Sequence, residues 1–566
     1  MAATFSDSGN LQGKRINKRF GYLAARLLAL LILALGTLSL SFVSSAANEY
    51  DIVIRNGRVL DGSGNPWFKA DIGIKDKKIV EVGKIQKSGK KEIDAAGLYV
   101  SPGWIDSMDQ SGSTFLESGR AENKLRMGVT TVVAGEGGFP VSAEKIPSYF
   151  KDLETSKIGV NFASYYSATQ ARVAVMGDVQ GAPTEVQLAA MNELVATAMK
   201  NGALGITTAL IYPPSAFHTT DELIAMSRIA AEYDGIYASH IRDESEGLLS
   251  AVEEAIQIGE ESGIPVEIFH LKAAYQPGWG TLMKDAGQVI DDARQRGVDI
   301  AVDVYPYTAG GTGLEATAPS WIFKKGSEKG FKILADPKMR AQLKKETLAG
   351  LEGWQSLVRA SGGWENVVLA NANSEEYKQF NGMNLVTIGE ELDRDPADAA
   401  WDITLSALPK RAYALFFMMS EDDVARAISY PWASIGSDAG SAKEGSLSDD
   451  LGLPHPRSYG TFPRIIAKYV REDSVLTLPD AIRKMTSWPA SRLGLDGRGL
   501  IRKGMWADIV IFDLESLQDR ADWENPTLYP EGITNVLVNG EIAIDGEDYR
   551  KVLAGQVIRA GGFQSN

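Results

Sequence analysis

The chain has 566 residues, of which 44% are hydrophobic and 23% are charged, and its formal net charge is −15. A chain of this length exceeds one hydrophobic core, so two or three domains are expected, and the ordinary composition excludes disorder for most of it. Nucleic-acid binding needs a basic face, so the acidic balance argues against a nucleic-acid partner.

The first segment, residues 1–47, has the pattern of an export signal. A basic stretch at residues 14–19 precedes an apolar run at about 27–43, and small residues follow up to Ala47. This order predicts a cleaved signal peptide and a periplasmic or secreted protein. The alternative is an uncleaved membrane anchor, because the apolar run is nearly long enough to span a bilayer. No other membrane association is expected.

Short strand-like segments lie at both ends of the remaining chain. Residues 48–101 and 497–566 both alternate apolar and polar positions between glycine turns. We therefore expect the two ends to form halves of one small β-sandwich. Because the chain contains no cysteine, this domain has no disulfides, and neither a thiolate nucleophile nor a thiolate metal ligand is available.

In the middle of the chain, residues 102–496, segments typical of buried apolar strands alternate with segments typical of amphipathic helices. Eight strand candidates are present: GWIDSMD, VTTVVAGE, NFASYYS, GITTALIY, GIYASHI, PVEIFHLK, DIAVDVYPY and ASIGSDAG. Eight such alternations predict an α/β fold, a parallel (β/α)8 barrel of the TIM type. A long, mostly polar stretch with helical periodicity at about 321–402 does not fit this alternation of strands and helices. We expect it to form a folded, lid-like insertion at the barrel mouth.

Two of the four histidines in the chain end neighbouring strand candidates. His240 ends IYASH and His270 ends VEIFH. Active sites of such barrels lie at the carboxyl ends of the strands, and side chains of adjacent strands are close enough to share one ion. The pair therefore predicts metal ligands. The alternative for each is a hydrogen-bonded core histidine.

Two carboxylates end further strands. Asp438, in SDAG, is placed to take a proton from an activated water, although an aspartate among Ser and Gly also caps helices. Glu136, in AGEGG, is the natural third ligand, because hydrolytic zinc has three protein ligands and no cysteine is present. The alternative for Glu136 is a surface carboxylate in a glycine turn.

Four residues are candidates for contact with a substrate. Arg457 lies in a turn with Pro456, and its guanidinium suits a bidentate grip on a carboxylate. Tyr305 and Tyr307 flank a proline at another strand end, and Lys272 lies beside His270. The alternatives are a surface salt bridge for Arg457 and packing at the cavity rim for the two tyrosines. For Lys272, the alternative is a contact that supports the histidines.

Together these stretches resemble the D-aminoacylase (N-acyl-D-amino-acid deacylase) branch of the amidohydrolase superfamily. The resemblance rests on the following stretches: SPGWIDS, GVTTVVAGEGG, ASHIRDES, IFHLKAA, DVYPYTAGGT, IGSDAGS, HPRSYGTFPR and GRGLIRKGMWADIVIFD. It implies a metal-dependent barrel with a β-sandwich from both termini. It also implies hydrolysis of N-acyl-D-amino acids, which are small molecules with a free carboxylate.

The resemblance also implies residue roles. His240 and His270 match the histidines of the family's tight zinc site, Asp438 its catalytic aspartate and Arg457 its carboxylate clamp, which one tyrosine of YPY assists. The family's His-x-His pair is Met108 and Gln110 here, and its cysteine ligand is replaced by Glu136 or Gly137. A thioether is a soft ligand and an amide oxygen a weak one, so we expect a single zinc-like ion.

Two other functions stay open at this point. One is hydrolysis of another amide or peptide, which a panel of D and L substrates would reveal. The other is a non-catalytic binding protein on the same scaffold, favoured by the replaced ligands. The joint presence of both histidines, Asp438 and Arg457 favours an enzyme.

Overall fold

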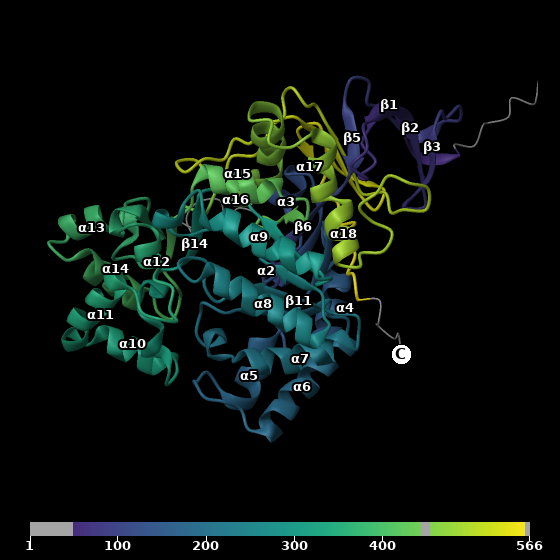
Figure 1. Cartoon of the computed structure of the whole chain (residues 1–566). Coiled ribbons are helices and arrows are strands. Elements are labelled where there is room, and N and C mark those ends of the chain that lie inside the picture. Colours follow the sequence, from purple (N-terminus) through teal and green to yellow (C-terminus); the bar gives the residue numbers. More distant parts are fainter. Residues whose placement is uncertain (1–48, 443–452, 561–566) are drawn as a thin grey trace, which may run out of the picture.

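The computed structural model of the chain describes residues 49–442 and 453–560. A central barrel lies between a sheet built from the two ends of the chain and a helical subdomain on the opposite side (Figure 1). The predicted export segment, residues 1–47, lies outside the described residues. Within them, no helix is long and apolar enough to cross a membrane.

Strands from both ends of the chain pair in one nine-stranded sheet. Its order is β21-β20-β19-β18-β5-β1-β2-β3, and β4 pairs with β1. The two ends meet where β5 pairs antiparallel with β18, and Ile54, Val100 and Ile509 are buried in the shared core. The strands are β1 (Tyr50–Val59), β2 (Phe68–Lys75), β3 (Lys78–Gly83), β4 (Gly89–Asp94), β5 (Tyr99–Pro102), β18 (Ile509–Phe512), β19 (Ile533–Val538), β20 (Glu541–Asp545) and β21 (Asp548–Tyr549).

All eight predicted central strands are present, and they pair in chain order as in a (β/α)8 barrel. One sheet has the order β6-β7-β8 and the other β9-β10-β11-β12-β13-β17; β8 and β9 follow one another along the chain. A parallel bridge between Asp109 and Ala439 joins the first strand to the segment after the last. The strands are β6 (Trp104–Asp109), β7 (Val129–Ala134), β8 (Asn161–Ser164), β9 (Tyr166–Ser167), β10 (Gly205–Ala209), β11 (Ile236–His240), β12 (Val266–Ile268), β13 (Ile300–Val304) and β17 (Ala433–Ile435).

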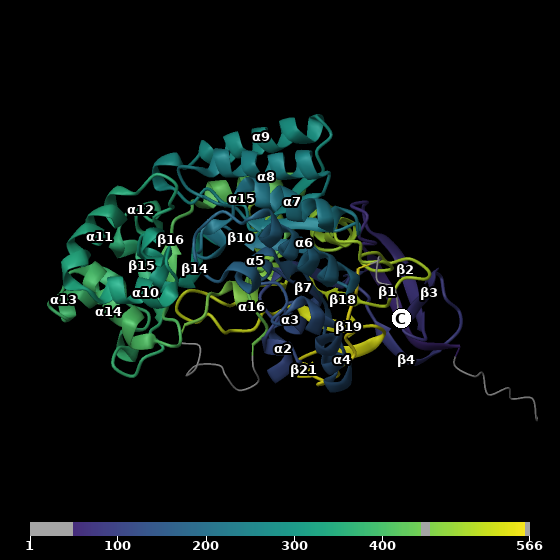
Figure 2. The same ribbon diagram turned by 90° about the horizontal axis from the view of Figure 1, so that it is seen from below.

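Helices cover the barrel strands (Figure 2). Several begin at side-chain caps: Thr184 and Thr219 each accept from a backbone N–H three residues later and form a capping box. The helices are α2 (Thr114–Glu117), α3 (Glu122–Arg126), α4 (Ile146–Ser156), α5 (Ala168–Met176), α6 (Glu185–Lys200), α7 (Thr220–Ala231), α8 (Leu248–Ser262), α9 (Leu282–Gln295), α15 (Glu421–Ser429), α16 (Arg457–Arg464), α17 (Leu478–Met485) and α18 (Ser487–Arg492).

The lid-like insertion is wider than the predicted range of 321–402. It has its own three-stranded antiparallel sheet of order β14-β16-β15, so it extends from about 309 to 417. The sequence AGGTG of its first strand lacks the apolar alternation that predicts a strand. Its elements are β14 (Ala309–Gly313), α10 (Ser327–Ala335), α11 (Pro337–Ala349), α12 (Leu357–Ala360), β15 (Val367–Asn371), α13 (Leu385–Glu391), α14 (Pro396–Ala407) and β16 (Tyr413–Phe417).

Candidate metal and substrate site

A cavity of about 660 Å³ opens at the carboxyl ends of the barrel strands. This volume suits a small-molecule ligand, and the position is where such barrels carry their active sites. Side chains of the insertion, including Phe331 and Trp354, form part of the wall. The polar residues of the lining are Gln110, Glu136, His240, Glu244, His270, Lys272, Tyr305, Asp438 and Arg457, among others.

Glu136, His240 and His270 meet at this cavity. Glu136 Oε1 lies 2.5 Å from His240 Nδ1 and 2.9 Å from His270 Nε2. The two imidazole rings are nearly perpendicular, with centroids 4.5 Å apart. In the described part of the chain, this is the one group of three such side chains whose ligand atoms all lie within 4.8 Å of one another.

A second carboxylate, Glu244, lies behind both histidines. Glu244 Oε1 is 3.0 Å from His270 Nδ1, and Oε2 is 3.3 Å from His240 Nε2; the latter contact has ion-pair distance but not hydrogen-bond alignment. Lys272 Nζ lies 2.5 Å from Glu244 Oε1 and 2.7 Å from His270 Nδ1. Such outer partners fix the orientation of metal-binding histidines. Lys272 therefore supports the histidines and also lines the cavity.

The electrostatics of this group favour charged forms. Burial alone would lower the pKa of His240, but Glu244 and Glu136 outweigh it and raise the pKa to about 9. Burial also opposes ionisation of Glu136 and Glu244, yet His240 above all holds the pKa of each carboxyl well below its ordinary value. The charged forms of His240, Glu136 and Glu244 therefore stabilise one another.

The donor set fits zinc. Two imidazole nitrogens and one carboxylate oxygen, with room for a water, are a common set of ligands in hydrolytic zinc sites. Ligand atoms around tetrahedral zinc stand about 3.3 Å apart, given bonds of about 2.0–2.1 Å. The present distances of 2.5 and 2.9 Å need to widen by less than 1 Å, a small shift for side chains. Glu136, His240 and His270 would therefore hold a zinc ion after a small side-chain adjustment.

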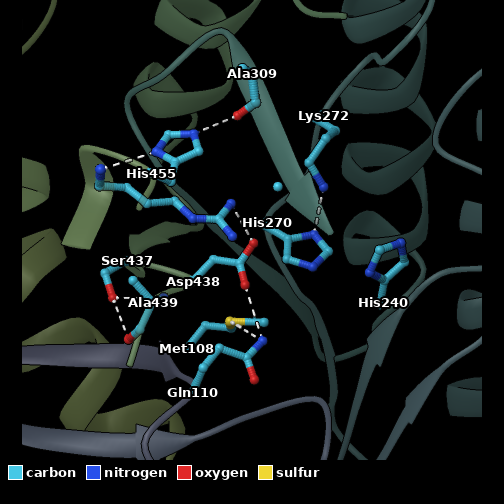
Figure 3. A network of polar contacts seen from close by, with 12 residues as sticks. Met108, Gln110, His240, His270, Lys272, Ala309, Ser437, Asp438, Ala439 and His455 are labelled. Atoms are coloured by element: carbon cyan, nitrogen blue, oxygen red, sulfur yellow. Dashed lines mark hydrogen bonds and ion pairs between the residues drawn. The ribbon is translucent and has the colours of Figure 1, made fainter. Parts of the chain in front are cut away.

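Asp438 and Arg457 form a second charged group across the cavity. Arg457 Nη1 lies 2.7 Å from Asp438 Oδ2, and the Arg457 side chain is only 4% exposed. Burial opposes the charge of Arg457, but Asp438 raises its pKa above the usual value. His455 holds this arginine from behind: its Nδ1 accepts from Arg457 N, and its Nε2 faces Ala309 O at 2.8 Å (Figure 3).

Met108 and Gln110 occupy the end of β6, where the resembled family has its histidine pair. Met108 is fully buried in a small apolar cluster with Ile105 and Val133. Gln110 is exposed in the cavity, and its Nε2 lies 3.1 Å from Asp438 Oδ1 and 3.2 Å from Glu136 Oε2. Neither residue offers a hard, charged metal ligand.

Two site residues have left-handed backbone conformations. His270 has φ of 38° and Asp438 has φ of 49°. Such conformations are costly for residues with a side chain and persist where the surroundings enforce them, often at functional sites. His270 N donates to the buried Asp303 Oδ1, and Asp438 N donates to Met108 O.

Comparisons with known proteins identify the family of the chain. The amidohydrolase family (Amidohydro_3) matches residues 443–544. D-aminoacylase of Alcaligenes xylosoxydans xylosoxydans is 32% identical over 537 residues, which cover 90% of this chain and 99% of the relative. The chain belongs to the D-aminoacylase family of amidohydrolases.

Solved structures of this family share the whole fold. One is N-acyl-D-glutamate deacylase of Bordetella bronchiseptica, complexed with zinc and a phosphonate mimic of the tetrahedral intermediate. It superposes with a TM-score of 0.74 at 30% identity, and the match covers 90% of this chain and all of that chain. A D-aminoacylase described as having a binuclear metal centre, with one-metal activation and second-metal attenuation, gives a TM-score of 0.75 at 30% identity and the same coverage. The predicted fold is confirmed.

Within this D-aminoacylase-family site, the structure separates the two predicted tyrosines. Tyr305 lines the cavity, and its ring lies 4.8 Å from the Arg457 guanidinium carbon. Tyr307 does not line it: its buried hydroxyl faces Pro456 O at 3.5 Å, and its ring packs on His455 and Trp523. The prediction of Tyr307 as a substrate contact is therefore replaced by a packing role.

Sequence reasoning missed three contributors to the site. These are the contact of His455 with Ala309 O, the acceptor role of Asp303 toward His270 N and the double contact of Gln110, and each joins residues far apart in the chain. A buried polar residue at the end of a strand was a signal for Asp303. No sequence signal marked Gln110 beyond its place in the motif.

Proposed function

We propose that the protein hydrolyses the amide bond of N-acyl-D-amino acids and releases a carboxylic acid and the free D-amino acid. One observation carries this proposal: the Glu136, His240 and His270 cluster and the Asp438–Arg457 pair face the same cavity. Membership of the D-aminoacylase family supports the reaction class and the D configuration.

Arg457 and Tyr305 would bind the carboxylate of the substrate. Among the described residues, buried Arg457 Nε and the Tyr305 hydroxyl have no hydrogen-bond partner. Buried donors without partners are costly, and a carboxylate ligand would satisfy both. The planar guanidinium suits this grip because it offers several N–H groups in a fixed plane.

Asp438 would move the proton. Its carboxylate lies between Gln110 and Arg457 and opens to the cavity opposite the metal ligands. It accepts a proton as water attacks the amide carbonyl, and it donates that proton to the leaving amine. Glu136, His240 and His270 would hold a zinc ion, which would supply the Lewis acidity needed to activate water near neutral pH.

The insertion would complete the cavity. Phe323, Phe331 and Trp354 come from it and line the wall, and Gln355 Oε1 accepts from Glu244 N at 2.8 Å. The insertion therefore supports the carboxylate that lies behind both histidines. The apolar side chains of this wall would lower the local dielectric constant, which would strengthen the charged contacts on the other side of the cavity.

We also propose that the protein acts outside the cytoplasm. The motivation is the signal-like segment at residues 1–47. Cell fractionation with protease treatment of intact spheroplasts checks it: full protection of the protein from protease would contradict export.

The reaction is tested with purified protein supplemented with zinc. The substrates are N-acetyl-D-amino acids, their L enantiomers and their carboxyl amides. We expect hydrolysis of the D acids, with much lower kcat/KM for the L forms and for the amides. Asp152→Asn, an exposed position on α4, is the control for Asp438→Asn. Equal rates on D and L forms would contradict the assignment.

A further inference from the structure

The amide of Gln110 joins two carboxylates of the site. Its Nε2 lies 3.2 Å from Glu136 Oε2. It also lies 3.1 Å from Asp438 Oδ1 (Figure 3). A primary amide carries two N–H groups, so it can donate one to each carboxylate. Both neighbours are acceptors, so this network assigns the nitrogen, not the amide oxygen, to the side that faces them.

We infer that Gln110 is a positioning residue that takes the place of a second metal ion, so that excess metal does not attenuate this enzyme. This inference rests on the proposed function. In a two-metal site, a second cation would offset the charge of the acidic groups around it. Here a neutral donor lies between Glu136 and Asp438, and it binds both without a cation.

The space below Gln110 offers nothing to a second hard cation. Met108 is fully buried there, and its Sδ lies 4.0 Å from Gln110 Nε2. Glycines make room for it: a Cβ on Gly436 would lie 2.8 Å from Met108 Cβ, and one on Gly135 would lie 3.3 Å from Met108 Cγ. Thioethers bind soft ions. The Met108 side chain therefore fills this volume without offering a ligand to zinc or magnesium.

The neighbouring carboxylates are already paired with an ammonium group. Lys124 Nζ lies 2.8 Å from Asp106 Oδ2 and 2.7 Å from Asp109 Oδ2, and all three side chains are fully buried. Ser437, next to Asp438, donates its backbone N–H to Asp106 Oδ1 at 2.8 Å. Lys124 therefore offsets the acidic charge at the end of β6 and fixes the loop that carries Asp438.

Both oxygens of Asp438 thus have a fixed partner: Oδ1 accepts a hydrogen bond, and Oδ2 forms an ion pair that lacks hydrogen-bond alignment. Oδ1 faces Gln110 and Oδ2 faces Arg457. In the D-aminoacylase described with second-metal attenuation, a second ion reduces activity. In this chain, the corresponding region holds Asp438 with a neutral amide, so we expect no attenuated state.

The test is a zinc titration of metal-depleted protein that records bound zinc by elemental analysis alongside kcat and KM. The wild type should bind close to one zinc and keep its full rate at a ten-fold excess. Gln110→Ala should also keep close to one zinc and a KM within about three-fold, while kcat falls about 10- to 100-fold, because a hydrogen bond to a charged group is lost. Gln342→Ala, which removes a surface amide contact to Glu346, is the control and should change nothing.

A gain-of-site variant sharpens the test. Met108→His with Gln110→His should bind a second zinc and lose rate as that zinc binds. The inference is overturned if the wild type binds a second zinc tightly or slows in excess zinc, or if Gln110→Ala keeps the wild-type kcat. Zinc content is measured without substrate, so failure to hydrolyse any N-acyl-D-amino acid would count against the proposed function alone.

Discussion

The two sides of the cavity hold their carboxylates in different ways. On the side of β7, β11 and β12, Glu136 faces His240 and His270, whose ring nitrogens can bind a metal. On the side of β6 and β17, Asp438 faces Gln110 and Arg457, whose N–H groups no metal displaces. In the proposed function, metal binding and proton transfer therefore fall on separate sides of one cavity.

The largest expected effect is a loss of kcat on substitution of Asp438, on the side of the cavity without metal ligands. Asp438→Asn keeps the shape of the side chain but removes the proton acceptor, so kcat should fall about 1,000-fold, within the range for general acid–base groups. Bound zinc should stay unchanged. Elemental analysis with steady-state kinetics measures both. Loss of zinc in this variant would show that the two sides are not separate.

The next effect is on the metal side. Glu136→Gln removes the negative charge from the ligand cluster, and zinc affinity should fall about 100-fold, because an unbalanced buried charge pair costs several kcal/mol. Competition with a zinc chelator measures the affinity. Glu144→Gln, an exposed glutamate in the same connection, is the control. Full zinc content and full activity would make Glu136 a turn residue only.

A smaller effect is expected for the carboxylate grip. Arg457→Lys keeps the charge but loses the planar fork, so KM for the acid substrate should rise about 10- to 100-fold. Zinc content should not change, and the rates on carboxyl amides should be nearly the same in Arg457→Lys as in the wild type. Arg502→Lys, at an exposed position, is the control. An unchanged KM would remove Arg457 from the substrate site.

The smallest effect is on stability and depends on pH. His240 has a folded-state pKa of about 9, above the ordinary value of 6.5. Its bound proton therefore stabilises the metal-free fold below about pH 6.5, and this contribution is lost as pH rises through about 9. The change is at most about 3 kcal/mol in the free energy of unfolding.

Urea unfolding of chelator-treated protein at several pH values measures this change. His240→Asn should flatten the dependence between pH 6.5 and 9, and saturating zinc should remove it, because the metal replaces the proton. A metal-free wild type whose stability rises across this interval would contradict the sign.

Patterns local in sequence predicted much of this architecture. The eight barrel strands were predictable because each is a buried apolar run that ends in polar residues, and His240, His270 and Asp438 follow directly from those ends. The start of the insertion was not predictable, because β14 reads AGGTG and its pairing with β16 is a long-range property.

The finer roles depended on contacts between distant segments. Tyr305 and Tyr307 look equivalent in sequence, but Tyr307 packs on Trp523, more than 200 residues away in the chain. From the sequence, Gln110 was interpreted only as the replacement of a histidine ligand, because a motif shows which residue type has changed. Only the positions of Glu136 and Asp438 show what the replacement binds.

The most direct test of the central claim is the number of zinc ions that full activity requires. Metal-depleted protein is titrated with zinc while hydrolysis of an N-acetyl-D-amino acid is followed. The account predicts that the rate rises in proportion to added zinc and reaches its plateau at one equivalent per chain. A rate that needs two equivalents, or that stays at the metal-depleted level throughout, would contradict it.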